Sequence, residues 1–402
     1  MLDDEAVDVT ARVRLRPNAD ARRIRHGFPW VYDNELVTDR RTKSLAPGTL
    51  AVLEDGERAP LGLVAVSPGS KIIARMLDRD PAAQVDRDWI AARIAVAAAL
   101  RERLYPAPYY RLVHAEADGL PGLVIDRFGA AAVIQPNAAW AETRLDLIAE
   151  ALQEVTGVTA IVKNAGGRAR KFEGLDEATG VIAGAVEGPV AVPMNGATYL
   201  ADLLGGQKTG LFFDQRDNHA FAQRLAAGAR VLDVFSHVGG FALAALAGGA
   251  VSALAVDGSQ AALDLAQDGA ARGGMAERFA TRKGDAFEVM AELAAAGERY
   301  ELVICDPPAF APAKPALEAG LRAYERVARL AAPLVAPGGY LVLCSCSHAA
   351  GLDAFRQASV RGIGRAGRGA QILRTGFAAP DHPQHPQLAE SGYLKALFFR
   401  LD

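Results

Sequence analysis

The chain has 402 residues, half of them hydrophobic, and its formal net charge is -3. This length exceeds one ordinary hydrophobic core, so we expect two or three domains. The sequence contains no apolar run long enough to span a bilayer, and it starts with the acidic stretch MLDDEAVDV. We therefore expect a cytoplasmic protein rather than a membrane or secreted one, in which the three cysteines stay reduced.

Residues 1–78 contain four short strand-like runs, VTARVRL, GTLAVLED, LGLVAVS and KIIARML. Glycine, proline and aspartate separate these runs, a pattern that predicts a small β barrel. Residues 11–30 hold six arginines and a single acid. This bias indicates either an RNA-binding face that follows a phosphate backbone or a solvated edge strand and turn. The candidate RNA-binding residues of this stretch are Arg14, Arg22, Arg23 and Arg25.

Residues 79–205 predict a second, mixed α+β domain. Apolar residues recur at helical spacing in DRDWIAARIAVAAALRERLY, and strand-like runs such as GLVIDRF and TAIVKN follow. We expect the β segment AVEGPVAVPMNGATYLADL to complete this domain. The basic segment KNAGGRARKFEG either binds RNA phosphate or forms a solvated hairpin. Its candidate RNA-binding residues include Lys163 and Arg168.

Strands and helices alternate over residues 206–402, which predicts a doubly wound α/β domain with a Rossmann-like parallel sheet. The predicted strands are RVLDVFS, SALAVDGS, RFATRKGDA, YELVICDPP, GGYLVLCSCS, AQILRTGF and YLKALFFRL. Ligands of such sheets bind beyond the carboxyl ends of the strands. The residues at those ends therefore carry the functional information.

The first of these strands leads through a glycine-containing turn into a helix, in VLDVFSHVGGFALAALAGGA, which suits a nucleotide-type cofactor. This turn lacks the G-x-G-x-x-G pattern, which disfavours a nicotinamide dehydrogenase. The second strand ends in Asp257, which can accept hydrogen bonds from ribose hydroxyls. The third ends in Asp285 and Ala286, which suit an adenine. Two prolines hold Asp306 rigidly at the end of the fourth.

Each of these features has an ordinary structural explanation. Asp257 could be a helix N-terminal acid, Gly239 a packing requirement and Asp306 a turn residue. The ordered succession of acids along the strand ends is harder to explain by packing. It predicts a class I S-adenosylmethionine-dependent methyltransferase.

Longer motifs add a family resemblance. The chain resembles the RlmI-like large-subunit ribosomal RNA cytosine-5 methyltransferases in GFPWVYDNE, HAEADGLPGLVIDRFG, GQKTGLFFDQRDN, DPPAFA, CSCS and DHPQHPQLAESGYLK. The resemblance implies an N-terminal PUA RNA-binding domain over residues 1–78. It implies a central α+β domain over 79–205 and a methyltransferase domain over 206–402. The chain departs from the family pattern at His237, where the family usually has tyrosine, and in DGAARGG, which replaces an asparagine-rich helix end.

The resemblance also implies which residues contact S-adenosylmethionine. These are Phe212, Asp214, Arg216, Phe235, Ser236, Gly239, Asp257, Asp285, Ala286 and Asp306. Asp306 would face both the methyl donor and the target base. The implied partner is large-subunit ribosomal RNA; no membrane is expected, and a homodimer is left open.

The cysteines Cys344 and Cys346 lie one residue apart, and a single Cys-x-Cys without a second ligand pair at zinc spacing does not predict a metal site. Methylation at C5 of a pyrimidine needs a thiolate that adds to C6. Ser345-Cys346-Ser347 resembles the Thr-Cys-Ser motif of RNA cytosine-5 methyltransferases, so Cys346 is the predicted nucleophile and Asp306 the acid that engages the base. Cys344 and Cys305 are expected to pack in the core.

Some alternatives stay open at this point. Ala309 replaces a second cysteine that some related enzymes use for product release, so the group that removes the C5 proton is not identified. A methyltransferase acting on a guanine nitrogen would share the sheet and Asp306 but would not need Cys346. A non-catalytic RNA-binding assembly factor could retain the fold without binding the cofactor.

Overall fold

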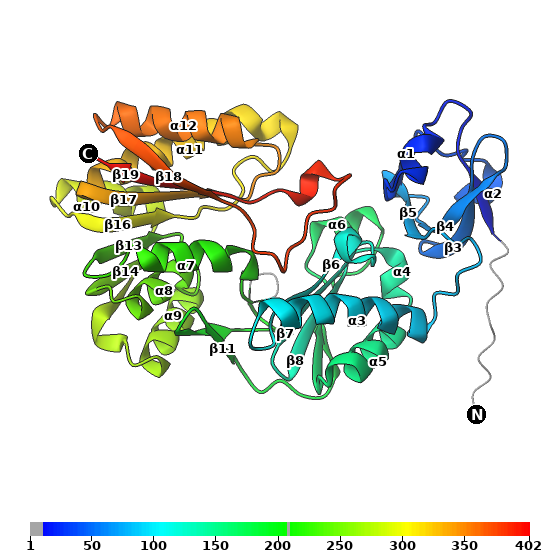
Figure 1. Cartoon of the computed structure of the whole chain (residues 1–402), viewed down its shortest axis with the longest axis horizontal. Helices are drawn as coiled ribbons and strands as arrows, with labels where there is room; N and C mark the ends of the chain where they lie inside the picture. Colours follow the sequence, from blue (N-terminus) through cyan, green and yellow to red (C-terminus); the bar gives the residue numbers. More distant parts are fainter. Residues whose placement is uncertain (1–10, 207–209) are drawn as a thin grey trace. The chain divides into compact units, whose positions relative to one another are not determined.

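The computed structural model describes residues 11–206 and 210–402, and the chain forms two compact units (Figure 1). The first unit runs to Glu187 and includes the later segment Pro383–Leu388. The second unit comprises Gly188–His382 and Ala389–Asp402. Within the described ranges, every helix is too short or too polar to cross a bilayer.

The first unit begins with a five-stranded sheet in the order β1-β3-β4-β5-β2. Its strands are β1 (Arg12–Arg14), β2 (Trp30–Tyr32), β3 (Thr49–Glu54), β4 (Pro60–Val66) and β5 (Ile72–Asp78), and its short helices are α1 (Ala21–Arg25) and α2 (Arg40–Lys43). Strand β1 pairs in parallel with β3, and the other pairs are antiparallel. Apolar residues of neighbouring strands, such as Leu53 of β3, Val64 of β4 and Ile73 of β5, are buried in one core. The predicted N-terminal β fold is therefore confirmed.

A second sheet of the first unit has the strand order β10-β9-β8-β7-β6. Its strands are β6 (Tyr109–His114), β7 (Leu123–Phe128), β8 (Ala131–Pro136), β9 (Ala160–Lys163) and β10 (Gly180–Ala183). The helices are α3 (Arg87–Leu104), α4 (Ala139–Glu142), α5 (Leu145–Thr156) and α6 (Arg168–Phe172). Helices α3 and α5 pack against each other and bury Ile90, Ile94 and Ile148 together with Trp140 against the sheet. This is the expected α+β arrangement.

The second unit is built on a seven-stranded sheet in the order β15-β14-β13-β16-β17-β19-β18. The strands are β13 (Arg230–Val234), β14 (Ser252–Asp257), β15 (Phe279–Lys283), β16 (Tyr300–Cys305), β17 (Val335–Ser345), β18 (Ala370–Gly376) and β19 (Lys395–Leu401). All neighbours pair in parallel except β19, which is antiparallel to β17 and β18. The strand order reverses at β13, where such sheets place their ligands.

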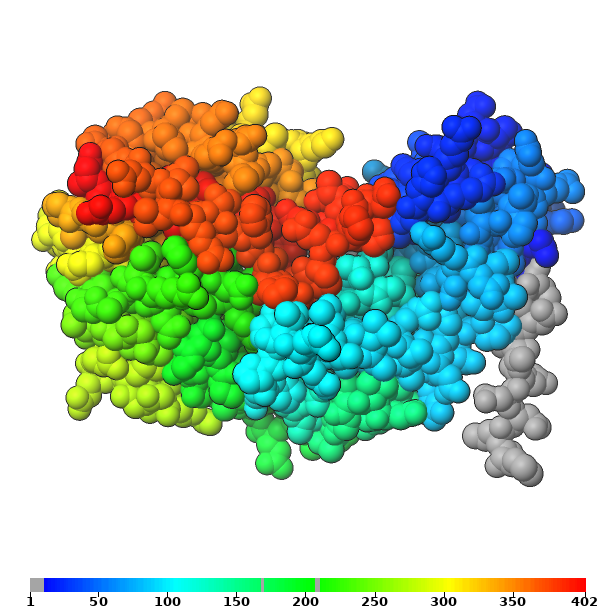
Figure 2. Space-filling view, in the orientation of Figure 1, coloured from blue at the N-terminus to red at the C-terminus, as the bar shows by residue number. Residues whose placement is uncertain are grey.

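Helices cover both faces of this sheet (Figure 1). One group is α7 (Arg216–Arg224), α8 (Gly240–Ala247) and α9 (Gln260–Arg272), and the other is α10 (Ala286–Ala295), α11 (Leu317–Ala331) and α12 (Leu352–Arg365). Helix α12 forms much of the orange surface in Figure 2. The Rossmann-like prediction is confirmed by this layering.

The hairpin of β11 (Val190–Met194) and β12 (Ala197–Ala201) belongs to the second unit, whereas the sequence assigned it to the central domain. The Tyr199 hydroxyl donates a 3.1 Å hydrogen bond to the carbonyl of Gly240 at the start of α8. A Cβ atom on Gly269 of α9 would lie 2.7 Å from the Thr198 carbonyl oxygen, so only glycine allows this approach. The division after residue 187 therefore differs from the expected boundary at 205.

Candidate active site

The turn after β13 has an unusual backbone. Phe235 and His237 adopt positive φ angles of 63° and 49°, and Gly239 follows at 78°. For a non-glycine residue this conformation costs about 1–3 kcal/mol and needs support from its surroundings. Asp257 gives that support, because its Oδ2 accepts a 2.9 Å hydrogen bond from the backbone N–H of His237. Its Oδ1 accepts one of 2.8 Å from the N–H of Ser259.

Three buried polar atoms near this turn have no hydrogen-bond partner within the described part of the chain. They are Oδ1 of Asp214, Oδ1 of Asp233 and Oγ of Ser236. The other oxygen of each carboxylate is bound: Asp214 Oδ2 accepts from the Tyr393 hydroxyl at 2.6 Å, and Asp233 Oδ2 accepts from the Ala242 N–H at 2.9 Å. Buried polar atoms are normally paired. This set therefore fits a polar ligand.

Asp233 was not among the predicted site residues. It is 1% exposed in β13, and burial raises its pKa to about 8, with the nearby carboxylates of Asp306 and Asp257 acting in the same direction. The signal in the sequence was an acid inside the apolar run RVLDVFS. Such a residue is costly in a core unless it has a polar task.

Aromatic rings form an apolar wall at the ends of β13, β15 and β16. The Phe235 ring centroid lies 6.2 Å from that of Phe287 and 6.4 Å from that of Phe310. Phe212 lies 5.0 Å from the His237 ring. Ala286 is buried beside this wall, while the exposed Asp285 caps α10 by accepting hydrogen bonds from two backbone N–H groups. The wall is suited to the flat face of an adenine.

The segment before α7 reaches the end of β16. The side-chain amide of Gln215 donates a 2.9 Å hydrogen bond to Oδ2 of Asp306 and accepts one of 2.7 Å from Asn218. Arg216 is buried, and its guanidinium carbon lies 5.5 Å from the Phe213 ring centroid. Gln215 was not predicted, because only folding brings it to a carboxylate 91 residues away.

The three cysteines have different environments. Cys305 and Cys344 are buried, which raises the pKa of each thiol above its usual value. Cys346 follows the end of β17 and is partly exposed. The Tyr324 hydroxyl bonds to Oγ of Ser345 at 2.9 Å and of Ser347 at 2.8 Å. This network fixes the backbone on either side of Cys346.

The predicted RNA-binding arginines of the N-terminal sheet differ in their surroundings. Arg22 is exposed and Arg14 is half-buried in β1. Arg23 pairs with Glu35 at 2.7 Å and stacks 3.9 Å above the Phe28 ring centroid. Arg25 pairs with Asp55. Arg23 and Arg25 therefore stabilise the fold of this sheet, although Arg25, like Arg22, is exposed.

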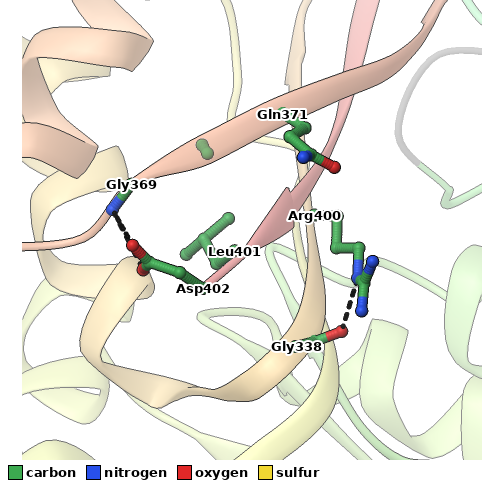
Figure 3. Close-up of a pocket in the computed structure, with 7 residues that line it drawn as sticks. Gly338, Gly369, Gln371, Arg400, Leu401 and Asp402 are labelled. Atoms are coloured by element: carbon green, nitrogen blue, oxygen red, sulfur yellow. Dashed lines mark hydrogen bonds between the residues drawn. The ribbon is translucent and has the colours of Figure 1, made fainter.

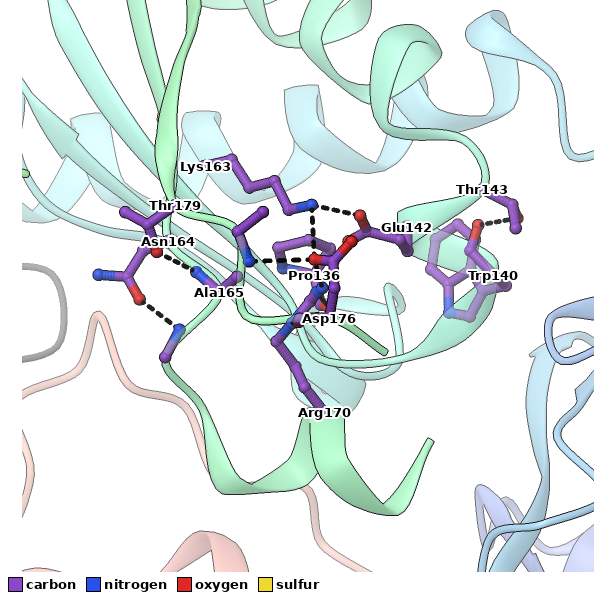
Figure 4. A network of polar contacts seen from close by, with 12 residues as sticks. Pro136, Trp140, Glu142, Thr143, Lys163, Asn164, Ala165, Arg170, Asp176 and Thr179 are labelled. Atoms are coloured by element: carbon purple, nitrogen blue, oxygen red, sulfur yellow. Dashed lines mark hydrogen bonds and ion pairs between the residues drawn. The ribbon is translucent and has the colours of Figure 1, made fainter. Parts of the chain in front are cut away.

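A closed polar network surrounds Lys163 at the end of β9 (Figure 4). Lys163 is 8% exposed, and its Nζ pairs with Glu142 and lies 3.5 Å from Oδ1 of Asp176. The fully buried Arg170 donates to Oε2 of the same Glu142 at 2.8 Å. This burial weighs against a direct contact of Lys163 with RNA. The side chain of Arg168 lies outside the described residues.

A surface pocket of about 370 Å³ lies at the opposite end of the second unit's sheet (Figure 3). Gly338, Gln371, Arg400 and Asp402 line it, far along β17 and β19 from the strand ends described above. It contains none of the predicted site residues.

The S-adenosylmethionine-dependent methyltransferase family matches residues 145–400. The chain belongs to this family. A PUA-like domain matches residues 13–79. The methyltransferase is 36% identical to "Ribosomal RNA large subunit methyltransferase I" of Aeromonas salmonicida, over 92% of this chain and 95% of that protein. It is 35% identical to "Ribosomal RNA large subunit methyltransferase" of Deinococcus radiodurans, over 97% and 98%.

Solved structures agree in fold with this methyltransferase. An S-adenosylmethionine-dependent methyltransferase structure from Streptococcus mutans aligns with a TM-score of 0.81 at 18% identity, covering 97% of this chain and 100% of that chain. A structure of SMU.776 complexed with SAH aligns with a TM-score of 0.82 at 18% identity and the same coverage. The predicted family, the PUA-like domain and S-adenosylmethionine as cofactor are confirmed.

Proposed function

We propose that this methyltransferase modifies C5 of a cytosine in large-subunit ribosomal RNA through a covalent bond between Cys346 and C6 of the base. The names of the relatives from Aeromonas salmonicida and Deinococcus radiodurans support the RNA target, as does the match to a PUA-like domain. The observation that carries the chemistry is the position of Cys346, the single partly exposed cysteine, after the end of β17.

The proposed reaction needs a nucleophile because C5 of cytosine is not nucleophilic in the resting ring. The Cys346 thiolate would add to C6, which makes C5 electron-rich. When bound, S-adenosylmethionine supplies the methyl group to C5 from its sulfonium. Loss of the C5 proton then restores the ring double bond and expels the thiolate. The base must leave its stack to reach the site.

The residues proposed to hold the cofactor surround the turn after β13. They are Phe212, Asp214, Arg216, Phe235, Ser236, Gly239, Asp257, Asp285, Ala286 and Asp306. Each oxygen of Asp257 accepts one backbone hydrogen bond and retains a lone pair, which suits the ribose hydroxyls. The unpaired atoms of Asp214, Asp233 and Ser236 would find partners on the polar end of the cofactor.

Asp306 is proposed to engage the N3/N4 edge of the cytosine. Gln215 fixes one of its oxygens by a 2.9 Å hydrogen bond, and the two following prolines limit movement of the backbone. Arg14 and Arg22 are proposed to contact the RNA backbone, because their surroundings favour this among the predicted RNA-binding residues. Arg168 stays a prediction.

The test compares Cys346→Ala with its matched control Cys344→Ala. Cys346→Ala should abolish methyl transfer while cofactor and RNA binding remain. Cys344→Ala should lose some stability and keep substantial activity. RNA that carries 5-fluorocytosine should form a covalent adduct with the wild type and with Cys344→Ala but not with Cys346→Ala. Fluorine cannot leave as the C5 proton does, so the adduct accumulates.

Full activity of Cys346→Ala would instead favour methylation of a guanine nitrogen, which needs no thiol. A protein that binds RNA and fails to bind S-adenosylmethionine would favour the assembly-factor alternative. Bisulfite mapping of large-subunit ribosomal RNA from a strain that lacks the protein should show one cytosine that has become unmethylated.

A further inference from the structure

Lys395 lies beside the turn that carries Cys346. Strand β19 pairs with β17 so that Lys395 is opposite Ser345. Its Nζ donates a 2.7 Å hydrogen bond to the carbonyl of Ser347 and a 2.8 Å bond to that of Tyr393. The ammonium group therefore binds the backbone at Ser347, the residue after Cys346. The pairing of β19 with β17 positions Lys395 opposite Ser345, the residue before it.

The surroundings of Lys395 are unusual for a charged side chain. The residue is 3% exposed, and the two hydrogen bonds that its Nζ donates go to carbonyl oxygens rather than to a carboxylate. Two carbonyl oxygens satisfy two of the three N–H groups, which leaves one donor. A buried ammonium is costly without an anion. Cys346 interacts electrostatically with Lys395 and is the group that can become that anion.

We propose that Lys395 is a positioning residue that holds Cys346 as a thiolate. This rests on the proposed function, in which Cys346 is the nucleophile. The third N–H of Lys395 would face the sulfur before attack. The sulfur lone pair forms the S–C6 bond, and the electron pair of the C5–C6 double bond moves into the ring toward C5. At C5 that pair forms the bond to the methyl group. When the C5 proton then leaves, its C–H bonding pair reforms the C5–C6 double bond, the pair of the S–C6 bond departs with the sulfur, and the thiolate returns beside the ammonium.

The other ionisable groups around Cys346 do not replace this cation. Tyr324 of α11 interacts with Cys346, but burial raises the pKa of its hydroxyl, which is engaged by the two neighbouring serines. Asp306, after β16, brings negative charge. His348 follows in the loop and is exposed. Burial lowers the pKa of Lys395 to about 8, and the Cys346 charge opposes this shift.

The experiment measures the rate at which iodoacetamide alkylates Cys346 as a function of pH, followed by mass spectrometry of the Cys346 peptide in the full chain. The wild-type midpoint should lie at least about one pH unit below that of the same cysteine in urea, since a neighbouring cation favours the thiolate. Lys395→Met should raise the midpoint toward the unfolded value, and Lys395→Arg should restore part of the shift. Lys314→Met, on an exposed lysine of the same unit, is the matched control.

A wild-type midpoint equal to that in urea would overturn the proposal even if the Lys395 variants failed to fold. An unchanged midpoint in folded Lys395→Met would also overturn it. A purely structural role of Lys395 would lower methyl transfer without moving the midpoint. Alkylation needs no RNA, so this result is separate from the proposed function. If Cys346 is not the nucleophile, Cys346→Ala stays active whatever the midpoint.

Discussion

Both units bury charged side chains, but the partners of these charges differ. In the first unit, Lys163 and Arg170 share the carboxylate of Glu142, and each also lies within ion-pair distance of Asp176. In the second unit, Lys395 contacts carbonyl oxygens, and Asp233 retains a buried oxygen without a hydrogen bond. Paired charges complete a fold, whereas incompletely paired ones suit a ligand or a reaction. The comparison therefore distinguishes Lys163, whose partners are carboxylates, from Lys395, whose partners are carbonyl oxygens, although both are simply lysines in the sequence.

The largest expected effect is on the closed network of the first unit. Arg170→Met should lower the free energy of unfolding by about 3–5 kcal/mol, because it breaks a buried ion pair. All three tryptophans lie in the first unit, so urea unfolding followed by tryptophan fluorescence measures this change. Arg103→Met, on an exposed arginine of α3, is the control. If Arg170→Met and Arg103→Met lowered the free energy of unfolding equally, the ion pairs of Arg170 would not stabilise the first unit and the contrast with the second unit would fail.

Asp257→Ala tests the polar residues around the turn after β13 in the second unit. It should weaken S-adenosylmethionine binding by about 1.5–3 kcal/mol, the contribution of hydrogen bonds that involve a charged group. Isothermal titration calorimetry gives the affinity, and Asp268→Ala on the exposed face of α9 is the control. Unchanged affinity would exclude Asp257 from the ribose site and leave it as the support of the Phe235–His237 turn.

Lys395 predicts a pH dependence of stability. Its folded pKa is lowered from 10.5 to about 8, so between these values the unfolded chain binds more protons. The unfolding free energy should therefore rise with pH in this window, by at most about 1.4 kcal/mol per pH unit from this group. Lys395→Met should flatten the rise. Circular dichroism of urea unfolding at several pH values measures it, and an equal slope in both proteins would contradict the inferred desolvation of Lys395.

The smallest effect concerns Arg22, an exposed arginine of helix α1. Arg22→Ala should reduce the slope of log affinity for ribosomal RNA against log salt concentration by about one. Arg23→Ala should instead destabilise its own sheet, because it loses Glu35 and the Phe28 ring. Filter binding over a salt series distinguishes the two variants. Equal slopes for Arg22→Ala and the wild type would move the phosphate-binding face elsewhere.

The sequence predicted the features that follow from local pattern. Alternating strands and helices identified the sheet, and Asp257 and Asp306 became candidate site residues because they stand at strand ends. Gln215 and Lys395 were missed because their contacts are set by tertiary docking: Lys395 meets the Cys346 turn only through the register of β19 on β17. Lys163 was expected at the surface, since its carboxylate partner Glu142 is 21 residues away in the sequence.

The hairpin at residues 190–201 shows the same limit at the level of domains. Its strand character was predicted correctly, because alternation within each strand is local. Its assignment to the central domain was not, because it depends on the docking of Tyr199 and Thr198 on α8 and α9. Contacts between distant segments decide which unit a short hairpin joins.

The place of β19 in the sheet has a consequence for folding. This strand follows β17 and β18 in the sequence but lies between them. Until β19 inserts, β17 presents an open edge of unpaired backbone groups, and Lys395 is not beside the Cys346 turn. Under the proposed mechanism, a chain that has formed the sheet only as far as β17 would carry the thiol without the cation that ionises it. Reactivity of the nucleophile would then arise late, with completion of the sheet, and would protect the folding intermediate from unwanted alkylation.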